Sequence, residues 1–456
     1  MHSSNQEIAD KEAKFDLNEL FFSITDHESR IVSGNDVFVR ISEYPRNELI
    51  GSFHNIVRHP DMPKIIFKTL WDYLKAGRPI AAYVKNRTKS GSYYWVLAAV
   101  FPTEDRYISI RIKPSSAIFA SVRALYFKLL MAESKEGMEE SGRILPSLLK
   151  ELGYENYDHF MGEALLGELK GCEHAAQQCI AENQAESHPS GSDANLTQIS
   201  REIETLIGCY DRWFERVGLF IGMKKVFEER GEALRFHARD IVFLSLNASV
   251  ASYRVEEGGE TFGILARDVR INAKENDRLI SDIYRALHRL SAVLNEMVFT
   301  VAAVHLQLIM TGYFVDELKC RNSAVSLVEA AENMEVLSEL IVLSSDRLSS
   351  LHYEIETQIR QSLKHLDLLE QQVMYLGYIQ IYGIIEAAAK NESAGFGGIF
   401  SQLKILISQT TGEIEVMQKT GENFVRESRS LASETVGISE TLERLQTSIQ
   451  NLKKGL

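Results

Sequence analysis

The chain has 456 residues, which is more than one hydrophobic core usually supports, so we expect two or three domains. Its composition, 45% hydrophobic and 25% charged with only 8 prolines, is typical of an ordered, helix-rich protein. The formal net charge is -13 and no basic stripe with interleaved aromatic residues occurs, so we expect no nucleic-acid binding.

The N-terminus and the most apolar segment both favour a cytoplasmic protein without a membrane span. The first residues, MHSSNQEIADKEAKF, have neither the apolar core nor the cleavage site of a secretory signal. The most apolar stretch, 298–315, is interrupted by Thr300, His305, Gln307 and Thr311, which suit a helical bundle better than lipid. The four cysteines match no standard zinc spacing, so we expect no metal site.

Residues 16–115 predict an α+β sensor domain. The segments LFFSITD and RIVSG read as strands, and three further strands lie between residues 79 and 112. A helix is expected from Met62 to Lys75, with Asp61 as its N-cap and Gly77 after its end.

Four runs in this domain carry a family resemblance: GNDVF, NIVRHPDMPKIIF, LKAGRPIAAYVKNRTKSGSYYWV and SIRIKPS. They resemble the PAS domain of the aerotaxis receptor family. The resemblance implies a bound flavin, FAD, whose redox state is the signal. It also implies that the matching positions Asn35, Arg58, His59 and Asp61 are important for flavin binding.

The residues themselves leave other interpretations open. An Arg and a His at a helix N-terminus suit a phosphate or a flavin ring, yet Asp61 also suits a helix cap and His59 a turn. Ile80 stands where the family usually has a Trp, which removes an aromatic wall for the flavin. Haem, with His27, His54 or His59 as its ligand, and an empty pocket are therefore the alternatives.

Residues 116–195 are expected to form a helical connector and a flexible link. Apolar periodicity predicts helices over 118–131, 144–152 and 160–169, and the polar stretch 183–195 reads as the link.

Residues 196–456 are expected to form a long antiparallel coiled-coil four-helix bundle. Apolar residues recur by threes and fours in two stretches, which is the pattern of paired helices. These residues are Ile280, Ile283, Leu287, Leu290, Leu294, Met297, Val301, Val304 and Leu308, and then Ile438, Leu442, Leu445, Ile449 and Leu452.

Two segments of the bundle, FLSLNASVASYRVEEGGETFGILARDVR and IIEAAAKNESAGFGGIFSQLK, resemble the signalling hairpin tip of methyl-accepting chemotaxis receptors. The resemblance implies two tandem hairpins with tips near 256–261 and 391–397. It implies partner contacts with the chemotaxis histidine kinase and coupling protein, or with other receptors. Ala251 and Glu260 depart from the receptor pattern. The matching partner-binding positions are Arg254, Glu257, Phe262, Glu386 and Glu392.

The spacing of the two tips predicts that one chain builds the bundle by itself. Helices over 197–255, 261–319, 324–390 and 398–454 have similar lengths, with a turn near 321–323, so all four can pack in register. An intramolecular bundle would not require a receptor homodimer.

These features together predict a sensory transducer related to aerotaxis receptors. No P-loop, nucleophile elbow or kinase motif occurs, so we do not expect an enzyme. The alternative is a scaffold or regulatory protein in which a cofactor-free PAS domain binds other signalling proteins.

Overall fold

The computed structural model describes residues 11–183, 194–253, 259–320, 327–389 and 395–455. The chain divides into two compact units. Unit 1 consists of Met1–Phe214, Asn295–Ser349 and Glu434–Leu456, and unit 2 consists of Glu215–Leu294 and Ser350–Ser433.

The α+β domain at the start of unit 1 is built on one antiparallel sheet in the order β2-β1-β5-β4-β3. Its strands are β1 (Phe21–Asp26), β2 (Ile31–Gly34), β3 (Ile80–Arg87), β4 (Tyr93–Pro102) and β5 (Arg106–Ile112). Between β2 and β3 the chain forms α1 (Asp36–Ser42), α2 (Arg46–Leu49), the 3-10 helix η1 (His54–Val57) and α3 (Lys64–Lys75). The α+β sensor fold expected from the sequence is confirmed.

The N-terminus of α3 is capped from a distant part of the chain. The backbone N–H groups of Lys64 and Ile65 each donate to the carboxylate of Glu133, at 2.9 Å. The prediction that Asp61 caps this helix is wrong, because Pro63 occupies the N-cap position and Asp61 lies two residues before it. The Asp61 carboxylate lies instead 3.1 Å from the Lys85 ammonium.

Three helices follow the sheet: α4 (Ala117–Glu136), α5 (Met138–Glu151) and α6 (Tyr157–Asn183). Glu168 of α6 is fully buried. Its carboxylate accepts hydrogen bonds from the Tyr83 hydroxyl of β3 at 2.7 Å and from the Ser116 backbone N–H at 2.8 Å. Ser116 is the N-cap residue of α4, so one side chain joins the sheet, α4 and α6.

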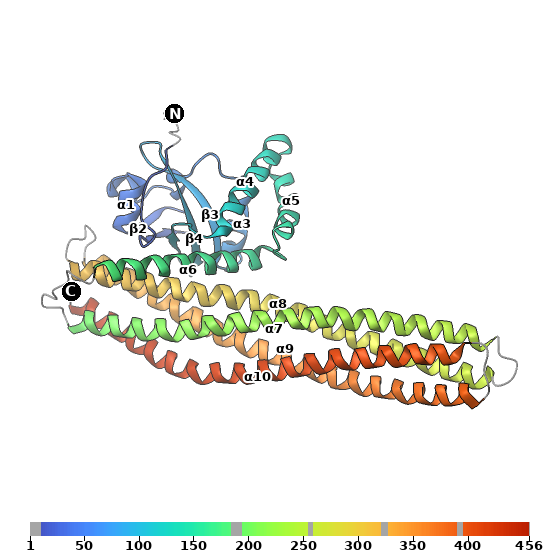
Figure 1. Cartoon of the computed structure of the whole chain (residues 1–456). Helices are drawn as coiled ribbons and strands as arrows, with labels where there is room; N and C mark the ends of the chain where they lie inside the picture. Colours follow the sequence, from blue (N-terminus) through green and yellow to red (C-terminus); the bar gives the residue numbers. More distant parts are fainter. Residues whose placement is uncertain (1–10, 184–193, 254–258, 321–326, 390–394, 456) are drawn as a thin grey trace. The chain divides into compact units, whose positions relative to one another are not determined.

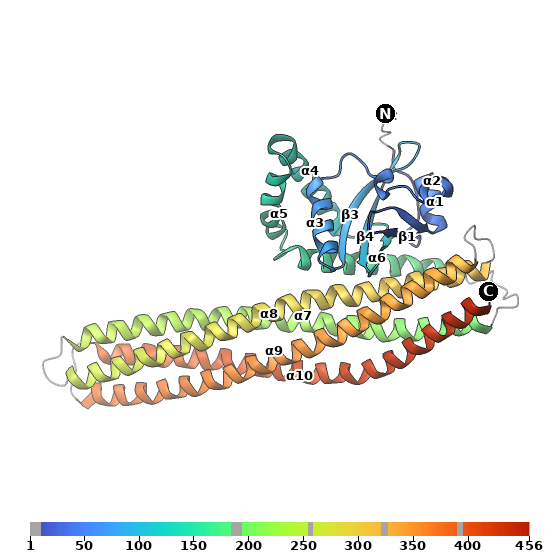
Figure 2. The same cartoon turned by 180° about the vertical axis from the view of Figure 1, so that it is seen from behind.

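Four long helices lie side by side as an antiparallel bundle (Figures 1 and 2). They are α7 (Ala194–Ser252), α8 (Gly259–Cys320), α9 (Leu327–Ala389) and α10 (Phe396–Gly455). Each helix begins and ends within a few residues of its predicted bounds. The predicted turn at 321–323 lies outside the described residues, as do most of the two predicted tips.

Helix α8 is long and apolar enough, by length and composition alone, to cross a membrane. However, 83% of its most apolar window is buried within the protein. Such burial is typical of a core helix in a bundle, and the sequence predicted a bundle helix for this segment.

Within unit 1 the outer surface of the sheet domain contacts the bundle helices. Phe22 of β1 packs edge to face against Phe314 of α8, with ring centroids 5.1 Å apart. Ser33 of β2 donates a hydrogen bond to the carboxylate of Glu329 in α9 at 2.8 Å, and Arg46 forms an ion pair with the same carboxylate.

A half-buried carboxylate near this contact makes stability depend on pH. Burial, followed by the nearby charge of Asp36, raises the pKa of Glu317 to about 7. The folded state therefore holds this proton more tightly than the unfolded state, and the resulting stability is present below about pH 4.5 and is lost as pH rises through about 7.

Glu317→Gln should remove this dependence, because an amide stays neutral. We expect the variant to gain stability over the wild-type chain between pH 5 and pH 8 by roughly 1 kcal/mol, a figure reduced for the partial exposure of the group. Thermal melts at the two pH values measure the difference. Asp316→Asn, at a neighbouring exposed carboxylate, is the control. An equal effect of Glu317→Gln at both pH values would contradict the assignment.

Candidate functional site

The sheet domain contains a cavity of about 350 Å³ between the sheet, η1 and α3. This volume is within the range of small-molecule pockets. The cavity combines aromatic and aliphatic side chains from α3 with polar side chains from the strands. Its lining residues are Ser23, Thr25, Glu28, Ser29, Phe53, His54, Asn55, Arg58, Phe67, Leu70, Trp71, Leu74, Val84, Asn86, Ala98, Val100, Tyr107, Ser109 and Arg111.

Arg111 is a buried cation in the cavity wall. Its Nη2 donates to the Ser23 hydroxyl at 2.7 Å and to His54 Nε2 at 2.5 Å. Its Nη1 is buried and has no hydrogen-bond partner among the described residues. Burial lowers the pKa of Arg111 to about 10, so the group remains charged at neutral pH. A ligand that offers a hydrogen-bond acceptor would satisfy this free donor.

His54 is neutral in this arrangement. Burial and the Arg111 charge lower its pKa to about 3. Because a guanidinium only donates, the Nε2 of His54 must accept from Arg111, which leaves the ring proton on Nδ1. An iron ligated through Nε2 of His54 would have to displace Arg111.

The other wall of the cavity is aromatic. Trp71 of α3 packs edge to face against Tyr107 of β5, with centroids 5.6 Å apart, and Phe67 lies one turn before Trp71. Ile80 is buried at the start of β3 and is not among the lining residues. The position where the family usually has a Trp therefore does not line this cavity, whereas Trp71 brings an aromatic side chain to it from a different element.

The four residues singled out for flavin binding have different positions. Only Arg58 lines the cavity, and its guanidinium lies 3.9 Å from the centre of the Phe67 ring. Asn35 is buried away from the cavity lining as the N-cap of α1, where it accepts from the backbone N–H groups of Phe22 and Phe38.

His59 and Asp61 belong to a turn that is fastened to β3. The buried His59 ring accepts through Nδ1 from the Asp61 backbone N–H at 3.1 Å. The backbone N–H of His59 donates to the backbone carbonyl of Lys85. Burial, together with the Lys85 charge, lowers the pKa of His59. These two residues do not line the cavity, and the turn they form positions the adjacent Arg58.

Sequence reasoning missed three of the polar and aromatic lining residues, Trp71, Asn86 and Arg111. The strand RYISIRI carries one signal of such a site. In this strand Arg111 lies between two isoleucines, and an arginine at such a position has to face a ligand, another polar group or solvent. No group of three His, Cys, Asp or Glu residues that could hold a metal occurs in the described part of the chain.

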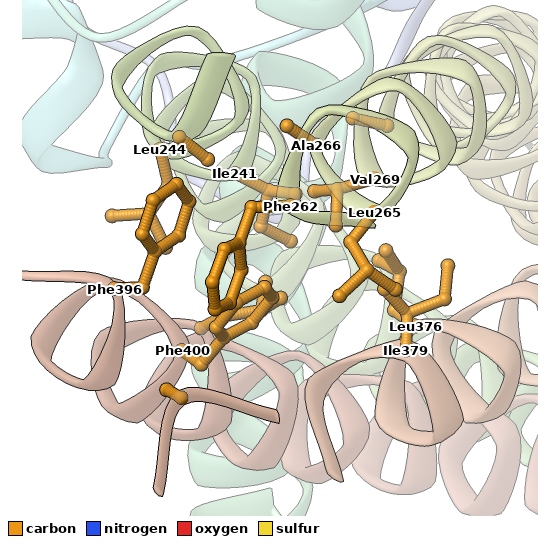
Figure 3. Packing of buried hydrophobic residues seen from close by; sticks show 14 residues of the cluster. Ile241, Leu244, Phe262, Leu265, Ala266, Val269, Leu376, Ile379, Phe396 and Phe400 are labelled. Carbon is orange, nitrogen blue, oxygen red and sulfur yellow. The ribbon is translucent and has the colours of Figure 1, made fainter. Parts of the chain in front are cut away.

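The predicted partner-binding positions at the tips are only partly described. Phe262 is fully buried and stacks on Phe396 with ring centroids 4.1 Å apart, inside the hydrophobic cluster shown in Figure 3. Its expected place on a contact surface is corrected to a place in the core. Glu386 is partly exposed on α9, while Arg254, Glu257 and Glu392 lie outside the described residues.

Comparison with known proteins identifies the sheet domain. Residues 31–110 match the family model of the PAS fold. The chain is 45% identical over 109 residues to the aerotaxis receptor of Escherichia coli (strain K12). The match covers 23% of this chain and only 22% of the receptor, so it concerns the PAS domain and not the whole protein.

Solved structures of light-oxygen-voltage (LOV) domains are also similar, at low scores. The light state of the blue-light photoreceptor Aureochrome1 LOV is 18% identical, with a TM-score of 0.21, and the match covers 22% of this chain and 85% of that one. The Rhodobacter sphaeroides LOV protein is 16% identical, with a TM-score of 0.21, over 30% of this chain and 90% of that one.

Proposed function

We propose that this chain is a non-enzymatic sensory transducer whose PAS cavity holds FAD and whose helical bundle passes the state of the cofactor to a partner. The observation that carries the proposal is the cavity, where a buried Arg111 with a free donor lies among aromatic side chains. The 45% identity to an aerotaxis receptor over the PAS domain supports the choice of a redox cofactor. A bound flavin would supply reversible reduction and oxidation.

Residues of the chain have distinct roles in this proposal. Arg111 and Asn86 offer donors to electron-rich ring atoms, and Trp71 and Phe67 offer apolar contact to a planar ring. Arg58 would bind the negatively charged phosphates of FAD. Since Arg111 also binds Ser23 of β1, a change in ligand charge at Arg111 acts directly on the sheet.

A visible absorption spectrum of the purified full-length chain tests the cofactor. We expect the bands of an oxidised flavin, or a rise in melting temperature when FAD is added to cofactor-free protein. Arg58→Gln should weaken FAD binding by about tenfold or more, because a charge-assisted hydrogen bond contributes about 1.5–3 kcal/mol.

Arg78→Gln is the matched control for Arg58→Gln. Both guanidinium groups lie over an aromatic ring, but Arg78 is outside the cavity, 4.5 Å above Tyr73. The absorption spectrum of a haem would show that the alternative cofactor, haem, is bound in place of the flavin. A colourless protein that shows no thermal shift with FAD or haem would overturn the cofactor proposal and favour the cofactor-free scaffold.

The output side of the proposal rests on the resemblance of the bundle to the hairpin of chemotaxis receptors. We infer that the chain acts in the cytoplasm on the chemotaxis histidine kinase and its coupling protein, or on other receptors, through the two tips. The bundle of one chain would then correspond to the two hairpins that a pair of receptor subunits contributes.

A further inference from the structure

Helix α7 carries an exposed apolar seam on its outer face in unit 2. Steps of three and four residues connect its members, and no charged residue occurs between Asp240 and Arg254. The exposed fractions of its apolar side chains run from 43% for Leu246 to 90% for Tyr253, just after the helix end. The α7 seam consists of Phe236, Arg239, Phe243, Leu246, Val250 and Tyr253.

Helix α9 carries a second seam with the same spacing. No charged residue occurs between Glu370 and Glu386, and the apolar members are exposed by between 40% for Leu368 and 71% for Tyr378. The exposed Met374 and Ile381 lie beside it and widen the apolar face. The α9 seam consists of Leu368, Gln371, Tyr375, Tyr378, Tyr382 and Ile385.

The two seams face away from each other, because α7 and α9 are diagonal in unit 2. Polar contacts join α7 to α8 and α10, and α9 to the same two helices. Figure 3 shows the inward side chains Leu244 of α7 and Ile379 of α9 on opposite corners of the cluster. The polar contacts are Tyr284 with Glu232, Arg230 with Glu413, Asn272 with Gln372, and Gln418 with Asp367.

The two seams match in their residue spacing, in the direction of their helices and in their position along the helices. Alternation by three and four is the spacing with which one helix packs against another in a coiled coil. Both helices run in the same direction, each seam has six positions, and each ends within four residues of its helix end. Arg239 is the one charged member of the two seams, so in a chain with a net charge of -13 these faces are surfaces on which two copies can meet with little repulsion.

We propose that a second copy of this chain covers the seams, with the α7 seam of one molecule packed in parallel against the α9 seam of the next. The contact joins two different surfaces on opposite sides of the bundle. Each molecule therefore binds two others, and association continues into a row or closes into a ring. The inference is independent of the cofactor and of any signalling partner.

Two charge substitutions in the full-length chain test this pairing. Phe243→Glu disables the α7 seam and Tyr378→Glu disables the α9 seam, so each variant alone should have the mass of one chain. An equal mixture should form dimers and nothing larger, since one intact α9 seam meets one intact α7 seam. The wild-type chain should exceed the dimer mass as its concentration rises. Sedimentation velocity or light scattering measures these masses.

The controls use exposed apolar residues outside the seams. Tyr353→Glu, at a tyrosine that is 73% exposed on α9, matches Tyr378→Glu, and Leu219→Glu, at a leucine that is 51% exposed on α7, matches Phe243→Glu. Both controls should associate as the wild-type chain does, and circular dichroism checks that all four variants are folded. A wild-type chain that stays monomeric at high concentration would overturn the proposal and assign the seams to another protein. A mixture that forms no dimers would overturn the pairing of α7 with α9.

Discussion

Phe262→Ala is expected to lower the free energy of unfolding by about 3–5 kcal/mol, the range for a phenylalanine removed from a closed core. Phe262 has no exposed surface, and its ring stacks on Phe396 with an interplanar angle of 15°. The cluster around it draws residues from α7, α8, α9 and α10, so the cavity left by the ring weakens contacts among all four helices. Urea denaturation followed by circular dichroism measures the loss.

Ile264→Ala is the control for this prediction. Ile264 lies two residues further along α8 and is 53% exposed, so its truncation should change stability by only about 0.5 kcal/mol. If Phe262→Ala proved as stable as Ile264→Ala and instead abolished binding of a partner, Phe262 would be a contact residue, as the resemblance to receptor tips first indicated.

The helices of the bundle were predictable because their signal is local. Apolar residues spaced by threes and fours define a helix wherever it packs, and the predicted helix over 261–319 corresponds to Gly259–Cys320. The strands β3, β4 and β5 were equally accessible, since turn residues separate three runs of β-branched and aromatic side chains.

The parts that could not be predicted depend on residues far apart in the chain. Glu133 caps α3 from 69 residues away from Lys64, and no local pattern announces such a cap. Arg111 and His54 come together across 57 residues to form the polar end of the cavity. The wrong prediction that Asp61 caps α3 has the same origin. Asp61 is an acceptable N-cap by its residue type and its place in the sequence, whereas the acceptor observed, Glu133, is distant in sequence.

The sequence also did not show which face of each helix points into the core. In α7 the buried Ile241, Leu244 and Ala248 alternate with the exposed Phe243, Leu246 and Val250, and both sets are apolar with spacing of three and four. Periodicity alone cannot decide which set forms the core when both satisfy the pattern. The outer seams therefore became recognisable only from the exposure of their side chains.

Glu168 is expected to be the most sensitive polar position of unit 1. Its fully buried carboxylate accepts hydrogen bonds from the Tyr83 hydroxyl, from the backbone N–H groups of Ser115 and Ser116, and from the Ser116 hydroxyl at 2.6 Å. In Glu168→Gln an amide NH₂ must face at least one of these donors. We expect a loss of about 2–4 kcal/mol, because a buried donor is left unsatisfied where a charge-assisted bond existed.

A double-mutant cycle separates this network from a general packing defect. Tyr83→Phe removes one hydroxyl and should cost about 1 kcal/mol in the wild-type chain, but clearly less in the Glu168→Gln background, where its acceptor is already compromised. Glu163→Gln, at a partly exposed carboxylate of the same helix, should leave the cost of Tyr83→Phe unchanged. If Tyr83→Phe cost the same in all three backgrounds, the hydroxyl and the Glu168 carboxylate would act independently. Coupling between them would mean that this carboxylate holds β3, one of the strands lining the cavity, to α6 and to the start of α4.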